Sequence, residues 1–206
     1  MPSPILSIRG LTRRFGDFEA VARLDLDVAP GERVALLGAN GSGKSTVLRC
    51  VAGSLAPSEG TVTVAGHPGG SAAARRLTGV SLSQERSFYL RLSGRENLEF
   101  FAAARVGRRA NAVRAARAVE AELELEEIAA KRVDRCSTGM VQQLAVARAL
   151  LADPALILLD EPTRSLDRAA VARMWGAVDR RPAAALLIAT HRDEDVQRCG
   201  RRVELG

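Results

Sequence analysis

Hydrophobic and polar residues alternate along the first part of the chain, which is typical of half-buried β-strands. The alternation runs through ILSIRGL (5–11), ARLDLDVAPGE (22–32) and GTVTVAG (60–66). Between the last two of these segments, RVALLG (33–38) is a denser apolar run that leads directly into a glycine-rich turn. We therefore expect small antiparallel strands near the N-terminus and the first strand of a buried core close behind them.

A helical periodicity replaces this alternation from Glu96 to about Leu125, and it returns in TGMVQQLAVARALLA (138–152). ALILLD (155–160) and ALLIAT (185–190) are continuous apolar runs, as in parallel strands that are covered on both faces. The fold class is therefore α/β, with a helical insert between two parts of a parallel core and a last strand in RRVELG (201–206). The core positions expected in the helix over 138–152 are Leu144, Val146, Ala147 and Leu150.

Charge and composition exclude some classes of function. The net charge is +6, but only Lys44 and Lys131 are lysines, so nearly all of the positive charge is arginine. No arginine stripe alternates with aromatic residues, so we predict no nucleic-acid partner, while a basic face toward a membrane or protein stays open. No apolar run is long enough to span a membrane, and MPSPILSIRG lacks the layout of a signal peptide. We expect a cytoplasmic chain whose cysteines, Cys50, Cys136 and Cys199, are reduced.

GANGSGKST (38–46) matches the pattern G-x-x-x-x-G-K-[ST] between a strand and a helix. Glycines let backbone N–H groups approach phosphates closely, and the N-terminus of the following helix adds its positive dipole end. Lys44 would reach the β- and γ-phosphates, and Ser45 would place its hydroxyl on Mg²⁺. The sequence therefore predicts a nucleotide site whose loop residues are Gly38, Asn40, Gly41, Ser42, Gly43, Lys44, Ser45 and Thr46.

LILLDEP (156–162) places Asp160 and Glu161 at the carboxyl end of a buried strand, where α/β sheets hold ligands. Asp160 is suited to hold the Mg²⁺ shell, and Glu161 to polarise the attacking water as a general base. A strand-end Asp-Glu pair is often only a helix cap, but beside a phosphate-binding loop it indicates catalysis.

Several nucleotide-hydrolysing families share such a loop, and further segments distinguish between them. Neither lysine stands in an N-K-x-D tetrapeptide, which excludes a typical GTPase. Gln84 follows an apolar strand, STGM (137–140) begins a helix, SLD (165–167) lies just past Glu161, and His191 follows the last core strand. Each of these segments alone is weak evidence for a particular family. Their order and spacing relative to the phosphate-binding loop make them informative.

Together these segments resemble the ATP-binding subunit of an ABC transporter over essentially the whole chain. GANGSGKST is similar to the Walker A loop, LILLDE to the Walker B strand, and Gln84 to the Q-loop glutamine. STGM stands where the LSGGQ signature stands, SLD at the D-loop, and His191 at the switch histidine. LTRRFGDFEA (11–20) resembles the segment in which an aromatic residue stacks on adenine, which the resemblance assigns to Phe15.

The resemblance implies a P-loop NTPase fold with a RecA-like parallel core, an N-terminal antiparallel β subdomain and an inserted helical subdomain. We expect one ABC ATPase domain over 1–206, with 1–92 and 153–206 forming the β subdomain and core, and about 93–152 forming the helical subdomain.

The resemblance also implies a mechanism in which a homodimer closes on two ATP molecules. Ser137, Gly139 and Asp167 of one subunit would face the nucleotide of the other, so Ser137 and Gly139 should matter little to a monomer's fold. His191 would contact the γ-phosphate, and Gln84 would link Mg²⁺ and water to an integral membrane permease. The chain would then lie on the inner face of the cell membrane, held there by the permease.

The signature departs from LSGGQ, since Cys136, Thr138 and Met140 replace the leucine, the first glycine and the glutamine. Its Ser-x-Gly-Met form resembles exporter ATPases that are encoded separately from their membrane subunits. The short stretch after the last strand argues against importers with a C-terminal regulatory domain. We therefore expect the ATPase of a membrane exporter. A soluble ABC ATPase acting on DNA or ribosomes, and a module that holds ATP without turnover, stay open as alternatives.

Overall fold

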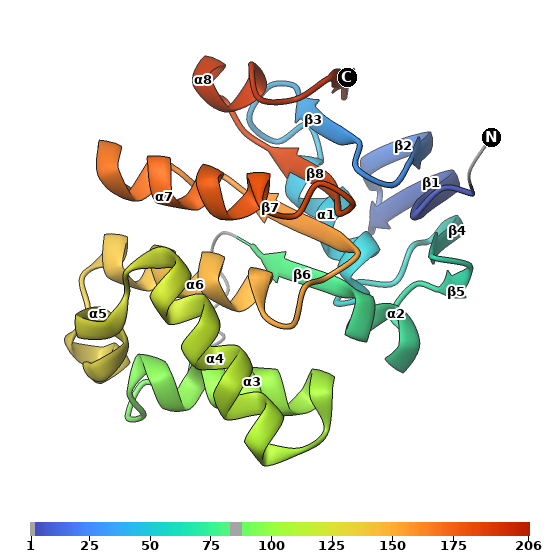
Figure 1. The fold of residues 1–206 in the computed structure, drawn as a ribbon. Helices are drawn as coiled ribbons and strands as arrows, with labels where there is room; N and C mark the ends of the chain where they lie inside the picture. Colours follow the sequence, from blue (N-terminus) through green and yellow to red (C-terminus); the bar gives the residue numbers. More distant parts are fainter. Residues whose placement is uncertain (1–2, 83–87) are drawn as a thin grey trace.

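The computed structural model describes residues 3–82 and 88–206. Its strands form a parallel sheet at the centre of the molecule and an antiparallel sheet beside it (Figure 1). The parallel sheet has the order β6-β7-β8-β3-β9, and the antiparallel sheet has the order β2-β1-β4-β5. The parallel strands are β3 (Arg33–Leu37), β6 (Thr78–Ser81), β7 (Leu156–Asp160), β8 (Ala185–Ala189) and β9 (Arg201–Glu204).

The central parallel strands β3, β7 and β8 are buried on both faces, as their continuous apolar sequences predict. In β7, Leu156 and Leu158 face one hydrophobic cluster, while Ile157 and Leu159 face another. The first cluster contains α1 (Lys44–Ala52) and the inner side of the antiparallel sheet. The second contains α7 (Arg168–Asp179) and the helices of the insert. This two-sided burial holds the carboxyl ends of the strands in place.

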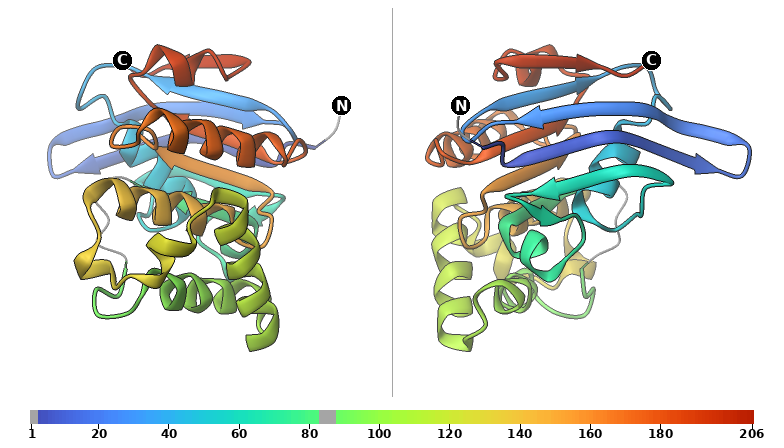
Figure 2. Two further views of the ribbon diagram at one scale, coloured as in Figure 1. Left: turned by 60° about the vertical axis from the view of Figure 1, so that its left-hand side comes forward. Right: turned by 90° about the vertical axis from the view of Figure 1, so that its right-hand side faces the viewer.

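The antiparallel sheet covers α1 on the side away from the parallel sheet. Leu6 pairs with Val28 and with Val64, and all three side chains are fully buried against α1 residues such as Leu48. The β1–β2 hairpin extends beyond the body of the molecule (Figure 2). The strands of this sheet are β1 (Leu6–Phe15), β2 (Phe18–Val28), β4 (Glu59–Val64) and β5 (His67–Pro68).

The helical insert lies against one side of the parallel sheet (Figure 1). Its helices are α3 (Gly94–Val106), α4 (Arg109–Leu123), α5 (Glu126–Ala130), the 3₁₀ turn η1 (Val133–Arg135) and α6 (Thr138–Leu150). The predicted core positions of α6 are confirmed, because Leu144, Val146, Ala147 and Leu150 are all buried. The division into subdomains at residues 93 and 152 stays a prediction.

The fold class predicted from the sequence is confirmed, and short elements complete it. These are α2 (Ala72–Leu77), which precedes β6, and α8 (Asp193–Val196), which follows β8. None of the described helices is long and apolar enough to cross a membrane. Cys50, Cys136 and Cys199 are free thiols in the structure.

Candidate nucleotide-binding site

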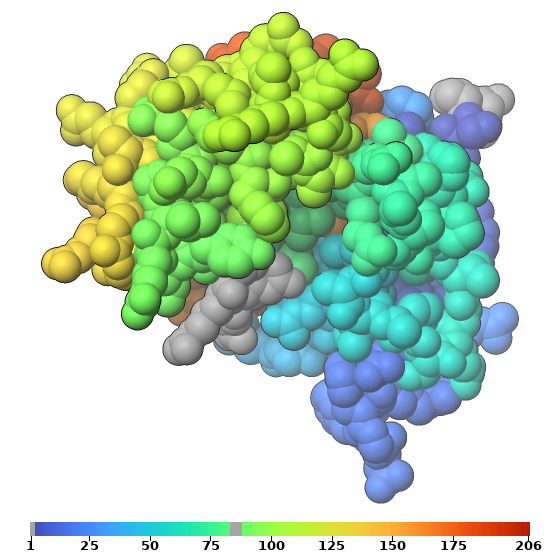
Figure 3. All heavy atoms as spheres, turned by 90° about the horizontal axis from the view of Figure 1, so that it is seen from below, coloured from blue at the N-terminus to red at the C-terminus, as the bar shows by residue number. Residues whose placement is uncertain are grey.

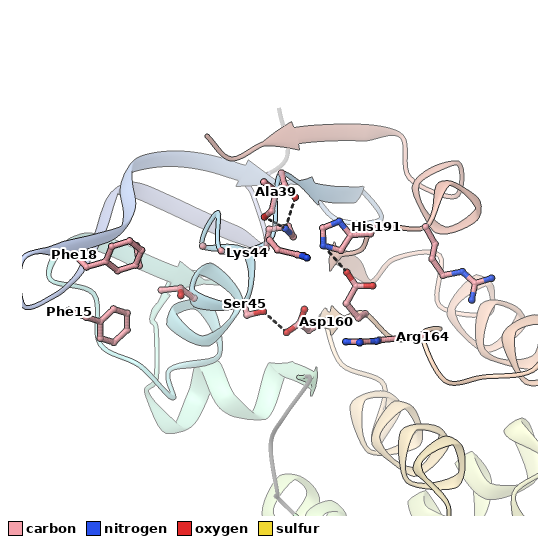
Figure 4. Close-up of a pocket in the computed structure, with 16 residues that line it drawn as sticks. Phe15, Phe18, Ala39, Lys44, Ser45, Asp160, Arg164 and His191 are labelled. Atoms are coloured by element: carbon pink, nitrogen blue, oxygen red, sulfur yellow. Dashed lines mark hydrogen bonds and ion pairs between the residues drawn. The ribbon is translucent and has the colours of Figure 1, made fainter.

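A cleft of about 930 Å³ opens at the carboxyl ends of β3, β7 and β8 (Figure 4). The loop after β3 forms one wall, the segments after β7 and β8 form the opposite wall, and the β1–β2 hairpin closes one end. Parallel sheets offer this edge to ligands because the chain leaves every strand there. The lining residues are Phe15, Phe18, Ala20, Gly38, Ala39, Asn40, Gly41, Gly43, Lys44, Ser45, Thr46, Asp160, Glu161, Arg164, His191 and Arg192.

The loop after β3 is built around Lys44, the first residue of α1. Its ammonium nitrogen donates to the carbonyl oxygens of Gly38 at 2.7 Å and Ala39 at 2.8 Å, so the loop curls around the charge. Gly43, directly before α1, has φ 91°, and a Cβ there would lie 2.2 Å from the carbonyl oxygen of Ala20. Only glycine fits this turn, which presents backbone N–H groups and the helix N-terminus to the cleft.

Two oxygen donors suited to a magnesium ion meet across the cleft. The Ser45 hydroxyl donates to Asp160 Oδ2 at 2.8 Å, although the two residues are far apart in the sequence. Asp160 ends β7 and is 3% exposed, so its carboxylate is held in the sheet and aimed at the loop. Hydroxyl and carboxylate oxygens are hard ligands of the kind that Mg²⁺ prefers. The residues present therefore fit the ion.

Glu161 follows Asp160 in a left-handed backbone conformation, with φ 47°, which is uncommon for a residue with a side chain. Its N–H donates to the Ala189 carbonyl at 2.8 Å, and its Oε1 lies 3.6 Å from His191 Nε2. Oε1 is buried and accepts no hydrogen bond within the part of the chain that the structure describes. Burial raises the pKa of this carboxyl, and His191 opposes the rise. The geometry leaves an acceptor beside the cleft that a bound water could use.

Phe15 and Phe18 flank the turn of the β1–β2 hairpin at the outer end of the cleft (Figure 4). Phe15 is 47% exposed and Phe18 is 63% exposed, whereas phenylalanine side chains are usually buried in folded proteins. The Arg13 guanidinium lies over the Phe15 ring, 4.4 Å from its centroid. Both rings are therefore placed to stack on a flat heterocycle.

A buried carboxylate, Asp195 of α8, joins the segments that carry Glu161 and His191. It accepts hydrogen bonds from the Thr163 hydroxyl at 2.5 Å, the Thr190 hydroxyl at 3.1 Å and the Trp175 indole N–H at 3.1 Å. Each of these side chains is at most 2% exposed. Asp195 thus fixes the chain after β7 relative to the chain after β8 from behind the cleft.

Comparison with known proteins identifies the family. The model of the ABC transporter family matches residues 21–164, which is more than half of the chain. The chain belongs to the ABC transporter family. The matched segment contains the phosphate-binding loop, STGM and Glu161.

Individual relatives include both importers and exporters. The lipoprotein-releasing system ATP-binding protein LolD 2 of Rhodospirillum rubrum is 35% identical, and the match covers 100% of this chain and 95% of that protein. The phosphonates import ATP-binding protein PhnC of Anaeromyxobacter dehalogenans is 41% identical over 94% of this chain, but the chain spans only 42% of that protein. The dimeric ABC cassette MJ0796, bound to ADP and Pi, superposes with a TM-score of 0.87 at 24% identity, covering 97% of this chain and 94% of that one. At this identity the likeness shows the shared fold alone.

The ABC signature segment lies away from the cleft within one chain. Ser137 is the exposed N-cap of α6 and accepts from the Met140 N–H at 3.3 Å, and Asp167 caps α7 by accepting from the Ala170 N–H at 2.8 Å. Neither lines the cleft, and neither does Gly139. These are the residues that the family resemblance assigns to the nucleotide of a second subunit.

One expectation about the ABC signature is wrong. Gly139 was expected to matter little to the fold of a monomer, but a Cβ there would lie 2.6 Å from the Ser165 carbonyl oxygen. The start of α6 packs directly on the backbone of the SLD segment, and only glycine allows this approach. Gly139 therefore has a structural role in the single chain.

The structure brings most of the predicted ABC site residues together. The predicted site residues that line the cleft are Phe15, Gly38, Asn40, Gly41, Gly43, Lys44, Ser45, Thr46, Asp160, Glu161 and His191, and their roles stay predictions. Ser42 faces Lys44 instead, with its hydroxyl 3.5 Å from the ammonium nitrogen. Gln84 lies outside the described residues.

Sequence reasoning missed Phe18, Arg164, Arg192 and Asp195. Phe18 could have been found from its place across the hairpin turn from Phe15. Arg164 and Arg192 add positive charge to the wall opposite the loop, and no motif marks them. The signal for Asp195 is weak because it stands in an acidic run, DED (193–195), that is typical of exposed surface.

Proposed function

We propose that this chain binds Mg²⁺-ATP in the cleft and hydrolyses it. The observation that carries the proposal is the convergence of three groups on one cleft. Lys44 lies in the loop, the Ser45–Asp160 oxygen pair lies beside it, and Glu161 with His191 lies opposite. A cation, a pair of metal-ligand oxygens and a base are the parts that phosphoryl transfer needs.

Each group has a definite task. Lys44 would exchange its bonds to the Gly38 and Ala39 carbonyls for phosphate oxygens, which attract an ammonium more strongly because they are charged. Ser45 and Asp160 would hold Mg²⁺, which supplies charge neutralisation at the β- and γ-phosphates.

Glu161 and His191 would act on the water and the γ-phosphate. The carboxylate of Glu161 takes the proton of the attacking water, and the raised pKa makes it a stronger base than an exposed glutamate. His191 lies 3.6 Å from this carboxylate and is 46% exposed, so its ring can donate to the γ-phosphate from the same side.

We propose further that two copies close on two nucleotides. Ser137 and the N–H groups at the start of α6 are exposed in the single chain, although a helix N-terminus favours an anion. A second copy would present this terminus to the γ-phosphate, with Asp167 facing the same nucleotide beside it. The dimeric state of the MJ0796 cassette, which shares the fold, supports this arrangement.

We propose that this dimer powers a membrane exporter and lies on the inner face of the cell membrane through an integral permease subunit. The Ser-x-Gly-Met signature supports export, and so does the match with the lipoprotein-releasing relative, which extends over 95% of that protein. Closure on ATP and opening after hydrolysis would transmit the work to the permease.

The test compares wild type with Glu161→Gln and with Glu127→Gln, which removes an exposed glutamate of α5 as a matched control. Glu161→Gln should retain ATP binding and lose hydrolysis by about 10²–10⁴-fold, because only the general base is removed. Glu127→Gln should hydrolyse like wild type. A wild-type rate no higher than that of Glu161→Gln would refute hydrolysis.

The partner is tested by purifying the tagged chain from detergent-solubilised membranes of its native cells. An integral membrane protein in stoichiometric amount supports the transporter. Ribosomes or DNA in its place would instead establish the soluble alternative.

A further inference from the structure

Arginine supplies nearly all of the positive charge of this chain, and some arginines have a clear structural task. A hollow of about 480 Å³ opens between α2 and α3, with β6 and α6 behind it, and Figure 3 shows this face hollowed between the two helices. Arg105 lines this hollow and donates to the carbonyl oxygens of Leu151 at 2.6 Å and Thr78 at 2.7 Å. Its guanidinium therefore joins α3 to the end of α6 and to the start of β6.

Two arginines line the nucleotide cleft, and their surroundings differ. Arg192 donates to the Thr163 carbonyl at 3.2 Å and to the Glu194 carboxylate at 3.0 Å, so its guanidinium is already paired. Arg164 is exposed, and its guanidinium forms no hydrogen bond or ion pair within the part of the chain that the structure describes. Arg164 therefore offers the cleft a positive charge and hydrogen-bond donors that a ligand can use.

The backbone that carries Arg164 is held in place. Its N–H donates to the Glu161 carbonyl at 3.3 Å, which closes a turn that begins at the left-handed Glu161. Thr163, directly before it, is 1% exposed, and its hydroxyl donates to Asp195 at 2.5 Å. The Thr163 carbonyl in turn accepts from Arg192. The backbone of Arg164 is therefore fixed relative to Glu161, and its side chain can still adjust to a ligand.

Position along the cleft determines which part of ATP Arg164 would meet. Phe15 and Phe18 lie at the outer end of the cleft, where they are placed to stack on the base. Arg164 lies on the wall that carries Glu161, opposite the loop around Lys44 (Figure 4). In the proposed function the γ-phosphate and the attacking water lie between Lys44 and Glu161. Arg164 therefore lies at the γ-phosphate end of the cleft.

The γ-phosphate end of the cleft needs a further positive charge. Asp160 and Glu161 both belong to this wall, and ionised carboxylates repel an anionic phosphate. Mg²⁺ held by Asp160 would offset one of these charges, and Arg192 is already paired with Glu194. The guanidinium of Arg164 would offset the charge of Glu161, and it can offer two parallel N–H donors to phosphate oxygens.

We infer that Arg164 is a further catalytic residue, whose guanidinium binds the γ-phosphate of the ATP in its own chain's cleft and binds it most strongly in the transition state. This inference rests on the proposed function, which places ATP in the cleft. In the reaction the water oxygen bonds to the γ-phosphorus and Glu161 takes a proton of the water. The bond from that phosphorus to the β–γ bridging oxygen breaks, and its electron pair passes to ADP. Arg164 exchanges no proton and stabilises the negative charge on the transferring phosphoryl oxygens.

The test compares wild type with Arg164→Ala, Arg164→Lys and the control Arg202→Ala. Arg202 is exposed on β9, lies outside the cleft and, like Arg164, forms no ion pair within the described residues. ATPase kinetics give kcat and KM. Binding of Mg²⁺-ADP with aluminium fluoride, a mimic of the transferring phosphoryl group, reports affinity for the transition state. ATP binding and the mass in solution are measured with Glu161→Gln also present, so that ATP is not consumed.

Arg164→Ala should lower kcat by about 10²-fold, and the affinity for the aluminium fluoride complex should fall by a similar factor. KM and ATP affinity should change by less than about threefold, because the contact is strongest in the transition state. Arg164→Lys keeps the charge without the paired donors and should restore part of kcat. The Tm of Arg164→Ala should stay within about 2 °C of wild type, because the guanidinium has no partner in the fold. Arg202→Ala should behave like wild type in every measurement.

A wild-type kcat in Arg164→Ala, when the wild-type chain hydrolyses ATP, would overturn the inference and leave the proposed function standing. A raised KM with unchanged kcat would show that Arg164 binds ATP and the transition state equally, and would overturn its catalytic role. Failure of Arg164→Ala with Glu161→Gln to double its mass when ATP is bound, where Glu161→Gln alone does so, would assign Arg164 to the contact between two copies and overturn the inference. A wild-type rate no higher than that of Glu161→Gln would overturn the proposed function as well.

Discussion

Removal of the Asp195 carboxylate should destabilise the chain and also misplace the catalytic pair. Asp195→Ala takes the common acceptor away from the hydroxyls of Thr163 and Thr190 and from the Trp175 indole. Thr163 lies two residues after Glu161, and Thr190 directly precedes His191. The substitution therefore removes the hydrogen bonds that hold the segment after β7 and the segment after β8 in place behind the cleft.

The size of the effect follows from the burial of these groups. Three donors that are at most 2% exposed would each lose an acceptor, at about 1–2 kcal/mol per donor. Asp195→Ala also removes a buried charge, whose desolvation is unfavourable, and this offsets part of the cost. The net loss in the free energy of unfolding is therefore about 3 kcal/mol. For a chain of this size that corresponds to a fall in Tm of about 6–12 °C. Asp195→Asn keeps one acceptor oxygen and should lose less than half as much.

The assay is thermal unfolding followed by ATPase kinetics at a temperature where every variant is folded. Asp193→Ala, which removes an exposed carboxylate of the same helix, is the matched control and should unfold like wild type. In Asp195→Ala the kcat should fall more than KM changes, because Lys44 and the loop stay in place, and Asp195→Asn should restore part of kcat. Equal Tm values for Asp195→Ala and Asp193→Ala would refute the reasoning.

Other positions give sharp tests. Gly139→Ala should lower the Tm by a few degrees, because overpacking against the Ser165 carbonyl costs about 1–3 kcal/mol and outweighs the gain in helix propensity of about 1 kcal/mol; a raised Tm would contradict the close approach. Burial raises the pKa of the Cys199 thiol to about 11, so at pH 8 the folded chain holds about one thiolate in a thousand and iodoacetamide should label it slowly, with reactivity rising toward pH 11. Rapid labelling of Cys199 at pH 8 without urea would contradict this. Ser45→Ala, which removes one hydrogen-bond donor to Asp160, should weaken ATP binding about tenfold with Mg²⁺ and hardly at all in EDTA; an equal loss in both buffers would exclude Ser45 as a metal ligand.

The sequence predicts the core of the fold because hydrophobic pattern and burial coincide there. RVALL, LILLD and ALLIA are apolar at nearly every position, and the structure buries these strands on both faces. The strand order β6-β7-β8-β3-β9 could not be predicted from this pattern, since β3, β7 and β8 offer similar apolar surfaces and could each pair with either of the others. Short elements such as α2 and α8 were missed because four to six residues are too few for a helical period.

The candidate site likewise contains residues that the sequence predicts and residues that it does not. The loop around Lys44 and the strand-end pair Asp160 and Glu161 are predictable, because backbone geometry requires glycine and a strand end at fixed spacing. Asp195 was not predictable, because Asp193, Glu194 and Asp195 have the same chemistry and only the turn of α8 decides that the third is buried. The role of Gly139 in the single chain depends on a tertiary approach to Ser165, which no local pattern records.

ATP should join two copies of this chain through the start of α6. The most direct measurement is the mass of Glu161→Gln in solution, by light scattering after size exclusion, with and without Mg²⁺-ATP. The mass should rise from the 21.9 kDa of one chain to twice that value on adding ATP, and Glu161→Gln combined with Ser137→Arg should stay at 21.9 kDa. A mass of 21.9 kDa for Glu161→Gln with ATP demonstrably bound would contradict the account.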